Sequence, residues 1–266
     1  MSTKRKLFGR EGNIFFPTQF ETTNKIPNGI YSLIFNHKDY RPEIIYDQPS
    51  FDLPEKLYGL DYGFIDRITT TFEQNSNNLG VLLTGYKGTG KTILCKYICN
   101  ILNIPVIRLP KRLGTDFFTQ FLSAINQDFI LFVDEYEKKF KDEKEELLDV
   151  MDGMFNIDNK ILFLLTSNDT SNISEFLINR PNRIHYIKRF SDLELDVIND
   201  IIDDLLTNKQ FKSELLEILP TFNHITMDNL ITIIKEINRF DCPPNQAMIH
   251  LNIEMKENKS RFGITK

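Results

Sequence analysis

The sequence predicts an α/β protein with a doubly wound parallel sheet, preceded by a β-rich extension and followed by a small helical domain. Between residues 61 and 190, continuously apolar runs alternate with helical segments, a pattern typical of parallel strands covered on both faces. From residue 191 onward the pattern is helical only. Residues 1–60 contain short β-like runs separated by turn residues. We therefore expect three parts, at residues 1–60, 61–190 and 191–266.

The β-rich extension is rich in Phe, Tyr, Pro and Asn. Its β-like runs are Asn13–Phe16, Gly29–Phe35 and Ile44–Tyr46, separated by turn signals such as Ile26–Gly29. These apolar runs need a surface to cover. We expect that surface to belong either to the chain's own central domain or to a neighbouring subunit.

The elements of the other two parts follow from periodicity and length. Four helical segments close the chain, and their spaced Leu, Ile and Met residues indicate the core of a small bundle; the polar tail 256–266 is expected to fray. In the central domain we expect strands at 80–84, 104–109, 129–133, 160–166 and 184–187, and helices at 61–75, 93–102, 115–126 and 144–155. In the last part we expect helices at 192–206, 211–219, 227–240 and 245–253.

Composition limits the class of protein. Of the 266 residues, 41% are hydrophobic, which is enough for a packed core, and the net charge of −5 argues against a broad nucleic-acid surface. A basic cluster at Lys4–Lys6 and Arg10 fits either a solvated terminus or a local basic patch. The three cysteines show no paired C-x-x-C spacing and are expected to be small buried hydrophobes in a reducing compartment. Because no run of eighteen apolar residues occurs, we expect a cytoplasmic protein without a membrane span.

One eight-residue stretch, Gly85–Thr92, has the pattern G-x-x-x-x-G-K-T of a phosphate-binding loop. The apolar run Gly80–Thr84 precedes it and the helical run Ile93–Leu102 follows, which is the strand–loop–helix context that the motif requires. A chance glycine-rich turn is the alternative, and this context disfavours it. Lys91 is expected to reach the β- and γ-phosphates of a nucleotide, and Thr92 to place its hydroxyl on Mg²⁺. The residues assigned to the nucleotide are Gly85, Tyr86, Lys87, Gly88, Thr89, Gly90, Lys91 and Thr92.

An acidic pair follows the apolar strand Phe129–Val133. In a parallel sheet the carboxyl ends of neighbouring strands share one edge, so Asp134 and Glu135 should lie beside the phosphate loop. We assign Asp134 to Mg²⁺ and Glu135 to polarising the attacking water. An acidic helix cap is the alternative explanation.

Two further polar segments follow later strands. Asn168 lies at the polar tip of the run that ends at Ser167, where it is either a turn residue or a group that orients the attacking water. Arg180 and Arg183 lie three residues apart just before the last strand. A planar guanidinium suits a developing phosphoryl charge, and two surface arginines are the alternative.

In chain order these segments resemble the AAA+ ATPases. Leu147–Gly153, which ends in Met-Asp-Gly, and Phe176–Ile184 resemble segments of the AAA clade within that group. The resemblance covers about residues 60–253 and implies a P-loop AAA+ domain with a helical lid domain, ATP and Mg²⁺ as cofactors, and ATP hydrolysis. It gives Arg180 and Arg183 the role of arginine fingers that act on the nucleotide of the next subunit, which implies a homo-oligomeric ring, usually a hexamer. It gives the nucleotide-site roles to Lys91, Thr92, Asp134, Glu135 and Asn168.

The substrate-threading loop departs from the family pattern. The nearest match is Lys111–Gly114, in which Arg112 takes the place of the family's aromatic residue. The short segment between the second strand and Asp134 is closer to the AAA proteins that assemble a mitochondrial respiratory complex than to unfolding motors. Ile26–Tyr31 is similar to a segment of AAA proteins from tailed bacteriophages, which would place the protein in a host cytoplasm.

Three functions remain open at this point. The first is remodelling or moving a protein partner, and the second is a nucleic-acid motor or loader. The third is a non-threading assembly or switch protein that uses ATP to change the shape of a ring. The clade-specific segments favour the first and the third function, and a protein partner over nucleic acid, whereas Lys111 and Arg112 keep a nucleic-acid role open because cations there would follow phosphates.

Overall fold

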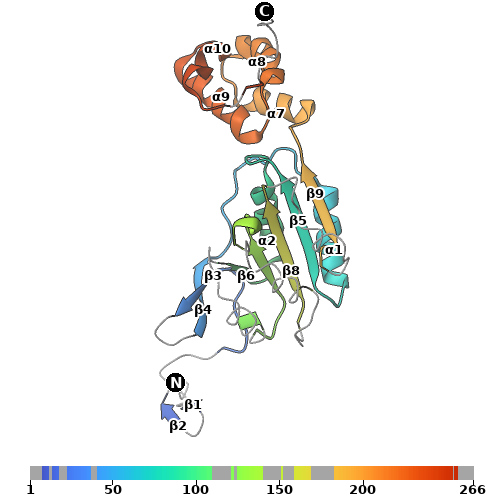
Figure 1. Cartoon of the computed structure of the whole chain (residues 1–266), viewed down its shortest axis with the longest axis vertical. Coiled ribbons are helices and arrows are strands. Elements are labelled where there is room, and N and C mark those ends of the chain that lie inside the picture. Colours follow the sequence, from blue (N-terminus) through green and yellow to red (C-terminus); the bar gives the residue numbers. More distant parts are fainter. Residues whose placement is uncertain are drawn as a thin grey trace, which may run out of the picture.

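The computed structural model is centred on a seven-stranded, mostly parallel sheet (Figure 1). The strand order is β4-β3-β6-β7-β8-β5-β9, in which β3 and β4 pair antiparallel and all other neighbours pair parallel. This mixed α/β architecture confirms the predicted fold class. The strands are β3 (Ile30–Asn36), β4 (Arg41–Gln48), β5 (Leu79–Gly85), β6 (Val106–Arg108), β7 (Phe129–Val133), β8 (Ile161–Ser167) and β9 (Tyr186–Phe190). The structure describes residues 8–11, 14–17, 23–36, 41–109, 121–122, 125–139, 151, 159–168, 183–253 and 255–256.

The apolar strands are buried on both faces, as continuous apolar runs predict. Alternate residues of β8 belong to two different apolar clusters, one on each face of the sheet. Helices α1 (Tyr62–Gln74) and α2 (Lys91–Leu102) cover one face. On the other face Leu122, Ile125, Tyr136 and Met151 pack against the strands.

The hairpin of β3 and β4 extends the central sheet across the boundary that we predicted at residue 60. Strand β3 pairs in parallel with β6, with Ile30 opposite Val106. Ile30 and Leu33 are buried in the two clusters of the central domain, so the extension covers the chain's own sheet with at least these residues. Earlier in the chain, β1 (Phe8–Glu11) and β2 (Ile14–Pro17) form a separate two-stranded sheet.

The helices after β9 gather at one end of the sheet (Figure 1). This helical part has an apolar core of its own. Its longest helix, α9, is capped by Thr226, whose side chain accepts a hydrogen bond from the Asn229 N–H. The helix predicted at 245–253 is shorter in the structure, because Leu251 takes extended backbone angles and the chain turns back onto the core. The elements are α7 (Leu195–Leu205), a 3₁₀ turn (Lys209–Phe211), α8 (Lys212–Ile218), a 3₁₀ turn (Leu219–Thr221), α9 (Met227–Phe240), α10 (Pro244–Ala247) and a 3₁₀ turn (Met248–His250).

Several predicted segments lie wholly or largely outside the described residues. These are the basic cluster near the start, the helices at 115–126 and 144–155, the loop Lys111–Gly114, the tail beyond residue 256, and Arg180. Within the part of the chain that is described, no helix has the length and apolar character needed to cross a bilayer.

Candidate active site

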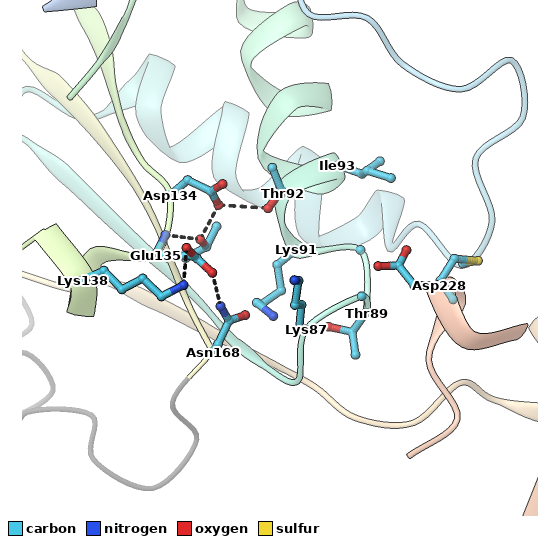
Figure 2. Close-up of a pocket in the computed structure, with 14 residues that line it drawn as sticks. Lys87, Thr89, Lys91, Thr92, Ile93, Asp134, Glu135, Lys138, Asn168 and Asp228 are labelled. Carbon is cyan, nitrogen blue, oxygen red and sulfur yellow. Dashed lines mark hydrogen bonds and ion pairs between the residues drawn. The ribbon is translucent and has the colours of Figure 1, made fainter. Parts of the chain in front are cut away.

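A cavity of about 500 Å³ lies at the carboxyl ends of β5, β7 and β8 (Figure 2). Its walls are residues 87–92 of the glycine-rich loop, the side chains that follow β7 and β8, and Met227 and Asp228 of the helical part. Ligand sites of parallel α/β sheets lie at this edge, and the volume is in the range of small-molecule pockets. The structure therefore gathers most of the residues that the sequence assigned to nucleotide chemistry.

The glycine-rich loop has backbone angles that side chains rarely adopt. Gly88 has φ 81° and Gly90 has φ 97°, both in the left-handed region. A Cβ at Gly88 would also lie 2.7 Å from a carboxylate oxygen of Asp228. Helix α2 begins at Lys91, and no described side chain caps its first N–H groups. Unpaired N–H groups at the start of a helix suit an anion such as a phosphate.

Lys91 lies buried under the loop, with 5% of its surface exposed. Its ammonium donates hydrogen bonds to the carbonyls of Gly85 (2.6 Å) and Tyr86 (2.7 Å). Burial lowers the pKa of Lys91, and the carboxylates of Glu137 and Asp134 oppose that shift. A phosphate in the cavity would give this ammonium an anionic partner in place of two neutral carbonyls.

The residues assigned to Mg²⁺ lie next to each other. The Thr92 hydroxyl donates to Asp134 Oδ1 at 2.9 Å, and the Thr166 hydroxyl donates to the same oxygen at 2.7 Å. Mg²⁺ prefers oxygen ligands, and in nucleotide sites it takes one or two from the protein and the rest from water and phosphate. The described residues contain no cluster of three His, Cys, Asp or Glu that would form an all-protein metal cage. The donor set of Thr92 and Asp134 therefore fits Mg²⁺ bound together with a nucleotide.

Each oxygen of the Glu135 carboxylate accepts a hydrogen bond from a different side chain. Asn168 Nδ2 donates to Oε1 at 2.6 Å, and Lys138 Nζ donates to Oε2 at 2.7 Å (Figure 2). The Glu135 N–H donates to the Thr166 hydroxyl at 2.9 Å, and the residue has a left-handed φ of 54°. The hydrogen bond from Lys138 is the main cause that lowers the pKa of Glu135, with a smaller contribution from Asn168 and opposition from burial. The carboxylate is therefore ionised near neutral pH, as a base must be.

Asn168 is positioned through its main chain. Its backbone N–H donates to Glu137 Oε1 at 3.0 Å, while its side chain reaches Glu135. This double attachment fixes the amide beside the carboxylate. Asn168 therefore lies next to Glu135, and its role in orienting water stays a prediction.

The helical part contacts the outer side of the glycine-rich loop. The Asp228 N–H donates to the Gly88 carbonyl at 3.3 Å. The Tyr86 ring stacks on His224, with ring centroids 3.4 Å apart and an interplanar angle of 23°. His224 Nδ1 lies 3.2 Å from a carboxylate oxygen of Asp192. The start of α9 therefore closes one side of the cavity.

Arg183 lies away from this cavity. Its carbonyl oxygen packs against Gly80, near the start of β5, whereas the glycine-rich loop follows the end of that strand. Five residues of extended strand separate Gly80 from Gly85, which is about 17 Å. Arg183 is also buried, with 7% of its surface exposed. It cannot reach its own subunit's cavity.

Sequence reasoning missed three polar residues that the structure brings to the cavity: Thr166, Lys138 and Asp228. Thr166 lies at the polar end of an apolar strand, and that position was a usable signal. Lys138 follows Glu135 by three residues, which is contact spacing on a helical turn. Asp228 is distant in sequence from every motif, and nothing local to it points to the cavity.

The comparison with protein families matches the segment of the chain that contains most of this site. Residues 81–191, less than half of the chain, match the family described as "ATPase family associated with various cellular activities (AAA)". The matched segment contains the glycine-rich loop, Asp134, Glu135 and Asn168. Residues 81–191 are therefore similar to the ATPase domain of this family, and the enzymatic class of the protein is ATPase.

Solved structures of RuvB from Thermotoga maritima are similar to this chain. One, described as a Holliday junction branch migration motor, is 17% identical with a TM-score of 0.50, and the match covers 73% of this chain and 71% of that chain. One variant of the same protein is 15% identical with a TM-score of 0.51, and the match covers 71% of this chain and 68% of that chain. A second variant is also 15% identical, with a TM-score of 0.52, and the match covers 73% of this chain and 71% of that chain. At this identity the likeness establishes the fold. A search of the curated proteins gives no match.

Proposed function

We propose that this protein hydrolyses ATP with Mg²⁺ in a homo-oligomeric ring, most simply a hexamer, and uses the energy to remodel or assemble a protein partner. The observation that carries the ATPase part is the pairing of Glu135 with Asn168 beside the Thr92–Asp134 pair, all on one cavity with Lys91. The resemblance to AAA proteins of tailed bacteriophages favours a host cytoplasm as its location.

The roles of the residues follow from their positions. The loop N–H groups and Lys91 bind and neutralise the phosphates, and Thr92 and Asp134 would hold Mg²⁺. The metal would supply electrostatic stabilisation of the charge that develops on the phosphate oxygens. Glu135 accepts the proton of the attacking water, and Asn168 orients that water or the base itself.

Separate measurements of binding and turnover test these roles. Lys91→Ala should weaken ATP binding, because it removes the buried cation. Glu135→Gln should keep ATP affinity and lose turnover by about a hundredfold or more. Nucleotide affinity can be measured by calorimetry and turnover by phosphate release. Unchanged turnover in Glu135→Gln would remove the assignment of Glu135 as the base.

The ring is tested through Arg180, which we propose acts on the nucleotide of the adjacent subunit. Arg183 is a weaker candidate, because it is buried within its own subunit and would have to be released first. Arg180→Ala and Lys91→Ala protomers, each inactive alone, should regain part of the activity when mixed, since some interfaces would pair an intact arginine with an intact lysine. Freely exchanging subunits that regain no activity would show that Arg180 does not act across subunits.

A nucleic-acid motor is the second candidate. The likeness to RuvB, whose structure is described as a branch migration motor, favours it, whereas the net charge of −5 does not. ATPase rates with and without single- and double-stranded DNA at low salt separate the two candidates. If DNA stimulates the ATPase rate and this stimulation fades as salt rises, the result would support the nucleic-acid motor and argue against the protein partner.

A further inference from the structure

Lys138 lines the cavity but has no role in the mechanism above. It belongs to the four-residue helix α4 (Tyr136–Lys139), and its ammonium lies 2.7 Å from Glu135 Oε2. Figure 2 shows Lys87, Lys91 and Lys138 reaching toward the same space from the loop, from α2 and from α4. Of these three lysines, Lys138 is the one that contacts the proposed base.

Both oxygens of that base are engaged in this arrangement. Asn168 donates to Oε1 and Lys138 donates to Oε2. A general base must lie within hydrogen-bond reach of the water whose proton it takes. A carboxylate oxygen can accept more than one hydrogen bond, but the water competes with these two donors for acceptor positions beside the cavity, so loss of the weaker donor favours the base. Asn168 is tied by its backbone N–H to Glu137. The Lys138 side chain is 62% exposed, and exposed lysine–carboxylate pairs are weak. Lys138 is therefore the donor that leaves more easily.

A bound triphosphate offers Lys138 a better partner than Glu135. The terminal phosphate carries more negative charge than one carboxylate and presents three acceptor oxygens. If Glu135 acts through one water, that phosphate lies one water molecule away from Oε2. The Lys138 ammonium already lies 2.7 Å from Oε2 on an exposed side chain, so it can turn toward that phosphate.

We infer that Lys138 exchanges Glu135 for the terminal phosphate of bound ATP, so that the base loses its ammonium partner only when a γ-phosphate is present. This inference rests on the ATPase function proposed above. Lys138 would then sense the γ-phosphate from within the subunit that binds it. ADP, which lacks this phosphate, leaves Lys138 on Glu135 and the base occupied.

The test compares triphosphate and diphosphate binding in Lys138 variants. Affinities for ADP and for the non-hydrolysable β,γ-imido analogue of ATP are measured by calorimetry in the presence of Mg²⁺. In Lys138→Met, which keeps the chain length and removes the charge, affinity for the analogue should fall about tenfold or more while affinity for ADP stays within about twofold. Lys138→Arg should restore the preference for the triphosphate, because it retains the cation.

The matched control is Lys96→Ala. Lys96 lies on α2, with its ammonium 5.7 Å from the centre of the Phe51 ring, and it does not line the cavity. This variant should bind both nucleotides like the unmodified protein. Thermal unfolding of each variant checks that folding is intact, as expected for a side chain as exposed as that of Lys138.

Three results would overturn the inference. If Lys138→Met lowers the affinity for ADP and for the ATP analogue by the same factor, the lysine does not distinguish the γ-phosphate. Faster turnover with an unchanged triphosphate preference would mean that Lys138 only restrains Glu135. If the unmodified protein binds neither nucleotide, the proposed function fails together with this inference, and that result is distinct from the other two.

Discussion

Thr166→Val should remove the hydrogen bonds that join strand β8 to Asp134 and to the backbone of Glu135. The buried Thr166 hydroxyl donates to Asp134 at 2.7 Å and accepts from the Glu135 N–H at 2.9 Å. Valine has nearly the same shape but makes neither bond, so a charged acceptor loses one donor and a backbone N–H loses its acceptor. We expect a loss of about 2–4 kcal/mol in the free energy of unfolding.

Turnover should fall as well, because Glu135 has a left-handed φ that the bond to Thr166 helps to maintain. A displacement of the base by about 1 Å costs roughly a hundredfold in rate, so we expect a decrease of about tenfold to a hundredfold. Urea unfolding gives the stability change, and phosphate release at saturating ATP gives the rate.

Thr84→Val is the matched control. Thr84 is as buried as Thr166 and lies on the adjacent strand β5, but its hydroxyl has no hydrogen-bond partner among the described residues. Replacing that hydroxyl by a methyl group should leave the free energy of unfolding unchanged or raise it. If both valine variants have the same stability and turnover, the reasoning from the Thr166 hydrogen bonds is refuted.

Two further predictions concern stability away from the cavity. Gly80→Ala should lower the free energy of unfolding by about 3 kcal/mol or more, because the new Cβ would lie 1.8 Å from the carbonyl oxygen of Arg183. If urea unfolding gives a free energy within about 1 kcal/mol of that of the unmodified protein, this prediction is contradicted. The hydrogen bond from Lys188 is the main cause that lowers the pKa of Asp61 in the folded protein. The Asp61 carboxylate therefore stabilises the fold at a pH above its ordinary pKa of 3.8, and this stabilisation is lost as the pH falls through the lower pKa of the folded state. Asp61→Asn should therefore be destabilising by less than about 1 kcal/mol at pH 7, and the difference should shrink toward pH 3; a constant difference would argue against the ion pair.

Local motifs predicted correctly which residues lie around the cavity in several places. The G-x-x-x-x-G-K-T loop, the acidic pair after β7 and Asn168 after β8 all lie on the cavity. These positions are predictable because each depends on a short stretch of chain at the end of a strand. In a parallel sheet, the carboxyl ends of the strands share one edge.

The long-range pairings required the tertiary structure. The hairpin β3–β4 joins the sheet beside β6, although nothing in residues 30–48 specifies that neighbour. The burial of Arg183 beside Gly80 depends on how β9 lies against β5. The contact of α9 with the phosphate loop through Asp228 depends on where the helical part packs.

The sequence by itself therefore determined the class of chemistry, the order of the elements and most of the residues that line the cavity. The tertiary structure alone decided that Lys138 contacts Glu135, that Thr166 joins Asp134 to Glu135, and that the helical part closes one side of the cavity. The physical reason is the range of the interactions. Backbone conformation and strand–loop–helix motifs are set over a few residues, whereas side-chain partners across a sheet or between domains are set by packing of segments that are distant in sequence.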